Sequence, residues 1–203
     1  KWFLKSAEQG YALSQGQVGY RYYNGIGVSK NLEEAFKWFQ KAANNGNVQA
    51  MKSLGACYYN GDGIAINTEE GFKWYLKAAN LNDNEAMGEV GYSYLNGIGT
   101  LKDEKKGFEW GLKSAEEGCA SSQWLVGNCY NYGQGTERDY KKAFYWYQKA
   151  TEQHLGDAYN ALAYCYIWGH GINKNETKAF ETINKAIELA PNNLDYKDTK
   201  GEL

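Results

Sequence analysis

The stretch VQAMKSLGACYYNGDGIAINTEEGFKWYLKAA, residues 48–79, contains a complete structural module and decides the fold. Apolar side chains recur every three or four positions over residues 48–59 and again over 68–79, a spacing typical of amphipathic helices. Gly61 and Gly63 lie between the two segments and predict a helix end and a turn, because glycine adopts a left-handed backbone at little cost. Thr68, followed by Glu69 and Glu70, is expected to begin the second helix, since a hydroxyl caps free amides and carboxylates favour the positive helix end.

The same pattern recurs at an unbroken step of 36 residues. Three kinds of position keep this step: Trp2, Trp38, Trp74, Trp110 and Trp146; Phe36, Phe72, Phe108, Phe144 and Phe180; and the glycine pairs that begin at Gly25, Gly61, Gly97, Gly133 and Gly169. The step divides the chain into a partial repeat 1–10, full repeats 11–46, 47–82, 83–118, 119–154 and 155–190, and a partial repeat 191–203. We therefore expect a single repeat domain.

A helix pair of this kind cannot bury its apolar face alone, so successive pairs must stack on one another. A column of small residues, Gly19, Gly55, Gly91, Gly127 and Ala163, indicates where two helices come close. Glycine in a helix lowers stability by about 1 kcal/mol relative to alanine, so a large side chain should press against it. We expect that side chain to be the indole of the tryptophan column.

The repeat resembles the Sel-1-like repeat (SLR) family, a relative of the tetratricopeptide repeat. The family pattern A-x-x-x-L-G-x-x-Y-x-x-G-x-G, followed by K-A-x-x-W-x-x-K-A-A-x-x-G, is matched in one repeat by Ala50, Leu54, Gly55, Tyr58, Gly61, Gly63, Trp74, Lys77, Ala78 and Ala79. The resemblance implies an all-α, right-handed α-solenoid of antiparallel helix pairs. It also implies a scaffold or adaptor, active in signalling, that binds a peptide or protein segment in a concave groove.

The last repeats depart from the pattern. Thr182 stands in the tryptophan column, and His154 stands where Gly46 and Gly118 end earlier repeats. The segment 186–193 is similar to the end of a tetratricopeptide repeat, and the chain begins without methionine at Lys1. We therefore expect a fragment of a longer chain that continues beyond Leu203 with tetratricopeptide-type units.

Composition argues against several functions. Lys and Arg number 22 and Asp and Glu 24, a net charge of −2, which disfavours nucleic-acid binding because phosphates require a basic surface. No apolar run approaches the roughly 18 residues of a membrane-spanning helix, so no membrane insertion is expected in this segment. We expect neither cofactor nor metal, because His170 with Cys165 falls short of a tetrahedral ligand set. No nucleophile with a neighbouring base recurs, so we do not expect an enzyme.

The four cysteines are expected to be free thiols. Cys57, Cys129 and Cys165 share one column, which places neighbours about 8–10 Å apart on stacked helices. That separation exceeds the roughly 7 Å between Cα atoms that a disulfide allows. Free thiols favour a reducing compartment such as the cytoplasm.

Aromatic residues make up 16% of the chain, including 18 Tyr and 7 Trp, which is more than the repeat pattern needs. If the first helix of each repeat lines the groove, the rings facing it are Tyr20, Tyr23, Tyr59, Tyr92, Trp124, Tyr132, Tyr164 and Trp168. Such rings dominate binding hot spots, yet each is equally open to a second interpretation as core between stacked repeats. Asn24, Asn60 and Asn96 are either groove donors or helix caps.

The sequence therefore predicts a non-catalytic module that binds a protein or peptide through aromatic side chains. The alternative is that this segment is the sensor or scaffold region of a larger multidomain enzyme or signalling protein, whose chemistry lies outside it.

Overall fold

A computed structural model describes residues 2–201, with side chains described from Lys5 onward, so the side chain of Trp2 and the end of the last partial repeat lie outside the described part. Over these residues the chain forms helices and no strand. The helices are α1 (Trp2–Glu8), α2 (Ala12–Asn24), α3 (Leu32–Asn44), α4 (Val48–Asn60), α5 (Thr68–Asn80), α6 (Asn84–Asn96), α7 (Glu104–Glu116), α8 (Ala120–Tyr132), α9 (Tyr140–Thr151), α10 (Gly156–Trp168), α11 (Glu176–Leu189) and α12 (Leu194–Gly201).

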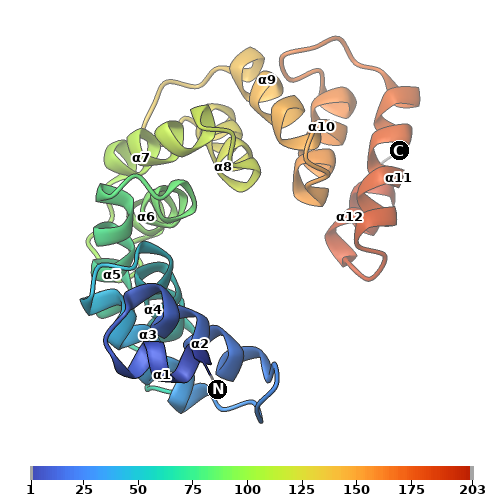
Figure 1. Cartoon of the computed structure of the whole chain (residues 1–203). Helices are drawn as coiled ribbons and strands as arrows, with labels where there is room; N and C mark the ends of the chain where they lie inside the picture. The colour runs from blue at the N-terminus through green and yellow to red at the C-terminus, as the bar shows by residue number, and fades with distance from the viewer. Residues whose placement is uncertain (1, 202–203) are drawn as a thin grey trace. The chain divides into compact units, whose positions relative to one another are not determined.

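The helices fall into two compact units, which we describe separately. Unit 1 ends at Lys102 and contains α1–α6, and unit 2 begins at Asp103 and contains α7–α12. Within each unit every helix packs against the next one along the chain, as Figure 1 shows. The predicted class, an all-α solenoid of stacked helix pairs, is confirmed in both units.

An edge-to-face pair of rings recurs at four junctions between the second helix of one repeat and the first helix of the next: α3 with α4, α5 with α6, α7 with α8, and α9 with α10. Phe36 and Tyr58 join α3 to α4, with ring centroids 5.3 Å apart and ring planes at 89°. The equivalent pair of Phe144 and Tyr166 joins α9 to α10, at 5.6 Å and 85°. The phenylalanine column of the sequence therefore supplies the contact between repeats, and edge-to-face geometry adds favourable quadrupole attraction to the apolar burial.

The two glycines of each turn have different tasks. The first one, as at Gly133 with φ 73°, ends the preceding helix in the left-handed conformation that the sequence predicts. The second one, Gly135, approaches α7 so closely that a β-carbon there would lie 2.0 Å from the carbonyl oxygen of Glu104. The turns with Gly63, Gly99, Gly135 and Gly171 therefore rest directly on the first turn of the second helix of the preceding repeat.

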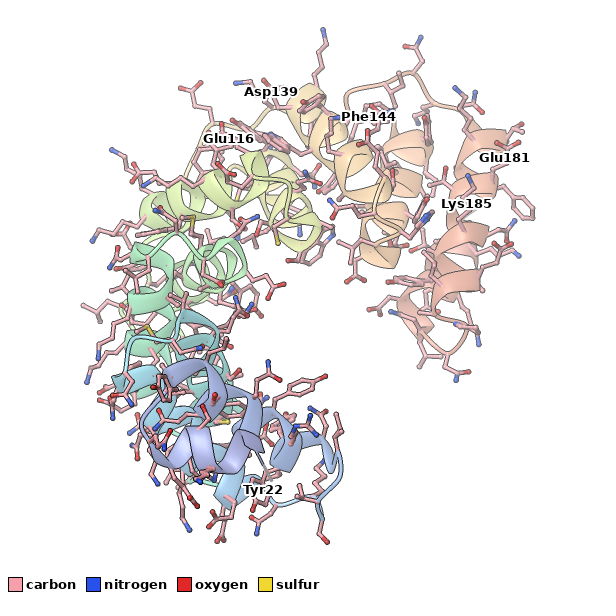
Figure 2. The ribbon with its side chains drawn as sticks, in the orientation of Figure 1. Tyr22, Glu116, Asp139, Phe144, Glu181 and Lys185 are labelled. Carbon is pink, nitrogen blue, oxygen red and sulfur yellow. The ribbon has the colours of Figure 1, made fainter. Side chains whose placement is uncertain are left out.

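The cap of the second helix is not the residue that the sequence indicated. Thr68 is the first residue of α5, whereas the side chain of Asn67 accepts a hydrogen bond from the amide of Glu70. The same position caps α3, α7, α9 and α11, and Asp139 at the start of α9 is labelled in Figure 2. The full column is Asn31, Asn67, Asp103, Asp139 and Asn175. Short polar side chains at the 36-residue step were the available signal.

The prediction that the tryptophan column faces the small residues is wrong. A β-carbon at Gly127 would lie 2.5 Å from the ring of Tyr147, and one at Gly55 would lie 2.9 Å from the ring of Tyr75. The ring at the glycine is therefore the one that follows the tryptophan in sequence. Trp74 is only partly buried, and the Lys77 ammonium lies 3.8 Å from the centroid of its ring. Equivalent cation–π contacts join Lys41 to Trp38 and Lys113 to Trp110.

Candidate functional site

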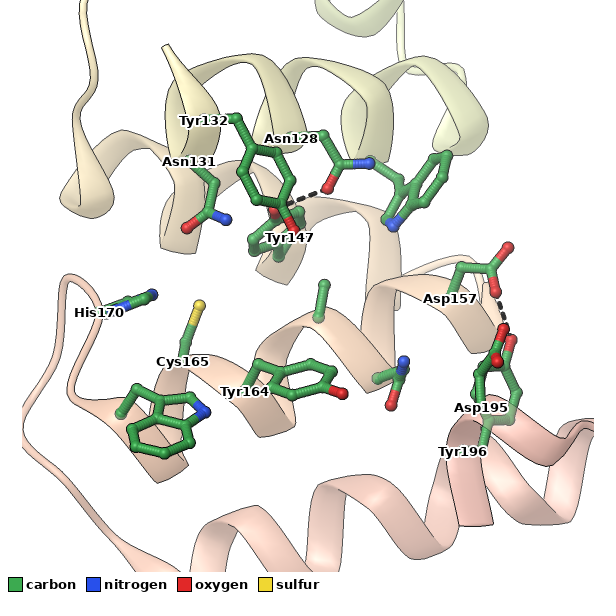
Figure 3. A pocket seen from close by; sticks show the side chains of 14 residues that line it. Asn128, Asn131, Tyr132, Tyr147, Asp157, Tyr164, Cys165, His170, Asp195 and Tyr196 are labelled. Atoms are coloured by element: carbon green, nitrogen blue, oxygen red, sulfur yellow. Dashed lines mark hydrogen bonds between the residues drawn. The ribbon is translucent and has the colours of Figure 1, made fainter. Parts of the chain in front are cut away.

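A groove of about 440 Å³ crosses one face of unit 2 (Figure 3). Most of its lining residues come from α8 and α10, each of which is the first helix of its repeat. Within each helix these residues recur every three or four positions, so they share one helix face. The lining residues are Trp124, Asn128, Asn131 and Tyr132 of α8; Tyr147 of α9; Asp157, Asn160, Ala161, Tyr164, Cys165 and Trp168 of α10; His170 of the following turn; and Asp195 and Tyr196 of α12. We call this set the unit-2 groove.

Tyr147 forms the floor of the groove. Its side chain is 2% exposed, and its hydroxyl donates a 2.7 Å hydrogen bond to Oδ1 of Asn128. Burial raises the pKa of this hydroxyl, so it stays protonated and remains a donor. The contact fixes the Asn128 amide with its oxygen towards Tyr147.

Acidic side chains gather at one end of the groove. The Tyr196 hydroxyl donates a 2.5 Å hydrogen bond to Oδ1 of Asp157, and Asp195 lies beside this pair in Figure 3. Gly156 makes the approach possible, since a β-carbon there would lie 2.9 Å from the Tyr196 hydroxyl oxygen. Burial, and then the hydrogen bond to the Asp157 carboxylate, raise the pKa of Tyr196. Negative charge is therefore held at the start of α10 and α12.

The four predicted rings of unit 2 lie together in this groove. Tyr132 is 62% exposed and Trp168 is 54% exposed, while Trp124 and Tyr164 are partly buried. Large exposed rings around a cavity are typical of interaction surfaces rather than of a core.

The four predicted rings of unit 1 divide into two kinds. Tyr20 and Tyr92 are 54% and 44% exposed on α2 and α6. Tyr23 and Tyr59 instead connect successive repeats: the Tyr23 hydroxyl donates to Asp62 at 2.9 Å, and the Tyr59 hydroxyl lies 2.8 Å from the Ser93 hydroxyl. For these two rings the interpretation as core between repeats fits the contacts.

The asparagines before the turns bond locally. Asn24 donates its side-chain amide to the carbonyl of Tyr20 at 3.0 Å, and Asn96 donates to that of Tyr92 at 2.9 Å. Asn60 lies 3.4 Å from a carboxylate oxygen of Asp62. The alternative that these amides serve the helix ends is the one that the contacts favour.

Sequence reasoning missed the polar half of the groove. Asn128 occupies the 36-residue column of Tyr92 and Tyr164, and Asn160 occupies the column of Trp124. Following every column that contains a groove ring, whatever the residue type, would have found both.

Cys165 and His170, which the sequence offered as a pair of metal ligands, both line the groove. Among residues 2–201 no three His, Cys, Asp or Glu side chains are placed to hold a metal ion. Burial raises the pKa of the Cys165 thiol to about 12, so it stays protonated at neutral pH and is not an activated nucleophile. In the same part of the chain, no helix is long and apolar enough to cross a bilayer.

The cysteines differ in accessibility in a way that chemical labelling detects. Cys57, Cys129 and Cys165 are buried, and burial raises the pKa of each thiol to about 12. Cys119 is partly exposed; burial raises its pKa, but hydrogen bonds led by that from Ser121 outweigh it and lower the pKa. We expect iodoacetamide at pH 8 to alkylate Cys119 alone in the native protein and all the cysteines in urea, as counted by mass spectrometry. Rapid native labelling of Cys129 would contradict the packing of α8.

The model of the Sel1 repeat matches residues 1–11, 12–47, 48–83, 84–119, 120–155 and 156–190. The chain is a Sel1 repeat protein. Sel1 repeats are typically non-catalytic scaffolds and generally mediate protein–protein interactions. A search of curated proteins gives no match.

Solved Sel1 repeat structures resemble this chain over most of its length. A protective antigen of uropathogenic Escherichia coli that displays an SLR fold is 34% identical, covers 92% of this chain and has a TM-score of 0.85. The chain spans only 40% of the length of that antigen. A Sel1 repeat protein from Oxalobacter formigenes is 35% identical over 90% of this chain and 75% of its own, with a TM-score of 0.80. Helicobacter pylori cysteine rich protein B is 26% identical over 68% of this chain and 98% of its own, with a TM-score of 0.50.

Proposed function

We propose that this Sel1 repeat protein binds a peptide, or an exposed segment of a partner protein, in the unit-2 groove and has no catalytic activity of its own. The observation that carries the proposal is the convergence of four aromatic side chains from α8 and α10 on one cavity, two of which, Tyr132 and Trp168, are more than half exposed. Tyr and Trp offer a large contact area with few rotatable bonds, so ordering them on binding costs little entropy.

The groove also offers polar groups that a peptide main chain needs. Asn131 and Asn160 line it beside the rings, and the indole nitrogens of tryptophan are further donors. A segment lying along α10 would pass all of these groups within the helix length of about 20 Å, which about six extended residues span. The expected ligand is therefore a short extended segment.

A displayed pool of random dodecapeptides tests the proposal. Peptides selected on the whole 203-residue chain would be resynthesised with a fluorophore, and their Kd measured by fluorescence anisotropy. We expect Trp168→Ala and Tyr132→Ala each to weaken binding about tenfold or more, the size typical of an aromatic hot spot.

Two exposed rings outside the groove provide matched controls. Tyr145 on α9 is 51% exposed and Phe180 on α11 is 48% exposed, which is similar to the 54% exposure of Trp168. Neither of these two rings lines the groove. Alanine at either position should leave the Kd unchanged while circular dichroism confirms the fold. A pool that yields no binder, or binders indifferent to Trp168→Ala, would overturn the proposal.

A further inference from the structure

The unit-2 groove presents negative charge without a matching positive side chain. Asp157 and Asp195 line it, and none of its lining residues is a lysine or an arginine. His170 does not supply the missing charge at neutral pH, because burial, and then the positive charge of Arg138, lower its pKa from its ordinary value. The bound segment must therefore supply any positive charge.

Both carboxylates also have a structural role, which does not neutralise them. Each stands in the first turn of its helix, where the positive end of the helix dipole stabilises it. Tyr196 bonds only one oxygen of Asp157, and within residues 2–201 neither carboxylate forms an ion pair with a lysine or arginine. Both side chains are exposed to solvent and so remain available to a ligand.

A third acceptor in the groove has no partner. Oδ1 of Asn160 is buried and receives no hydrogen bond. Buried polar atoms almost always have a partner, so this unpaired oxygen favours a small rotation of the Asn160 amide towards a donor on the ligand. Asn160 lies one helical turn from Asp157 and one from Tyr164, so this acceptor belongs to the same stretch of α10 as the carboxylate.

Aromatic rings accompany these acceptors. Tyr164 follows Asn160 by one turn, and Trp124 holds in α8 the position that Asn160 holds in α10. A cation already lies near the other end of the groove, since the Lys174 ammonium is 5.8 Å from the ring centroid of Trp168. Asp157 and Trp168 stand at opposite ends of α10, about 16 Å apart along the axis, so Lys174 does not occupy the acidic end.

We propose that the acidic end of the unit-2 groove recognises an arginine side chain of the bound segment. A guanidinium group carries five N–H donors in a plane, which suits two carboxylates and an amide oxygen, and its flat faces stack on aromatic rings. A lysine ammonium supplies the charge but neither the plane nor the forked donors. This inference rests on the proposed function and specifies the ligand that the groove selects.

The peptide pool described above tests the inference when its sequences are read. We expect arginine to be enriched at one position of the binders that depend on Trp168. In a resynthesised binder, replacing that arginine by citrulline keeps the shape and removes the charge, and should weaken binding about tenfold. Replacement by lysine should have a smaller effect than citrulline.

Variants of the protein locate the contact. Asp195→Asn should weaken binding of the arginine peptide about fivefold and leave binding of the citrulline peptide unchanged. The reason is that the protein variant and the citrulline replacement remove the same interaction. Asp198, an exposed carboxylate on the same helix outside the groove, is the matched control, and Asp198→Asn should change neither Kd.

The outcomes separate the two proposals. Binders that depend on Trp168 but lack arginine, or that bind equally well with citrulline, would overturn the arginine inference and leave the proposed function standing. A pool without any Trp168-dependent binder would overturn both.

Discussion

Replacing Gly135 by alanine is expected to lower the free energy of unfolding by about 3 kcal/mol or more. Gly135 has φ 69°, and its β-carbon would lie 2.0 Å from the carbonyl oxygen and 2.6 Å from the carbonyl carbon of Glu104. Those atoms belong to the backbone of α7, so no side-chain rotation relieves the overlap. Relief requires the turn after α8 to move away from α7, which disrupts the contact between two repeats.

Gly133 provides a control within the same turn. Its φ of 73° is nearly that of Gly135, but the nearest atoms to its β-carbon are 3.6 Å away, an ordinary contact. Gly133→Ala should therefore cost only the left-handed backbone conformation, about 1 kcal/mol. Urea denaturation followed by circular dichroism at 222 nm measures both variants. Equal losses would show that the close approach of the turn to α7 contributes nothing to stability.

The local structure of the repeat could be predicted because it depends on short-range chemistry. The predicted helices 48–59 and 68–79 correspond to α4, Val48–Asn60, and α5, Thr68–Asn80. The apolar spacing fixes the helix, and glycine fixes its end, without reference to any distant residue.

The partner of the glycine column could not be predicted in the same way. Trp146 and Tyr147 are neighbours in sequence and differ by about 100° around the helix, so either ring could have faced Gly127. Hydrophobicity does not distinguish them, because both are large aromatic residues. The choice depends on how α8 and α9 rotate against each other, which a repeat period does not encode.

The candidate groove shows the same division. The sequence predicted its rings from the excess of aromatic residues, and four of the predicted rings line one cavity in unit 2. Tyr23 and Tyr59 could not be separated from them, because their packing depends on Asp62 and Tyr75 in other parts of the sequence. Asp157 and Asp195 look like ordinary surface residues at helix starts, and only the fold brings them to one end of a groove.

Replacing Tyr147 by alanine is expected to cost about 3–5 kcal/mol, the range for a fully buried aromatic side chain. The ring fills the space that the missing side chain of Gly127 leaves open, and its hydroxyl holds Asn128. Alanine would leave a cavity between α8 and α9 and an amide oxygen without its donor. Tyr147→Phe keeps the ring and removes only the hydrogen bond, so we expect a loss of about 1 kcal/mol.

The adjacent tryptophan distinguishes this explanation from the one that the sequence suggested. Trp146 is larger than Tyr147 but only partly buried, so Trp146→Ala should cost less than Tyr147→Ala although it removes more atoms. Urea midpoints and m-values for the three variants would be compared, with an unchanged m-value showing that the same structure unfolds. A greater loss for Trp146→Ala would mean that the tryptophan column, and not the ring after it, supports the glycine face.

Because Tyr147 is also the floor of the groove, the Tyr147→Phe variant has a second use. It frees Asn128 while preserving the fold, so a change in peptide affinity in that variant would come from the loss of the hydroxyl–amide pair in the groove and not from unfolding.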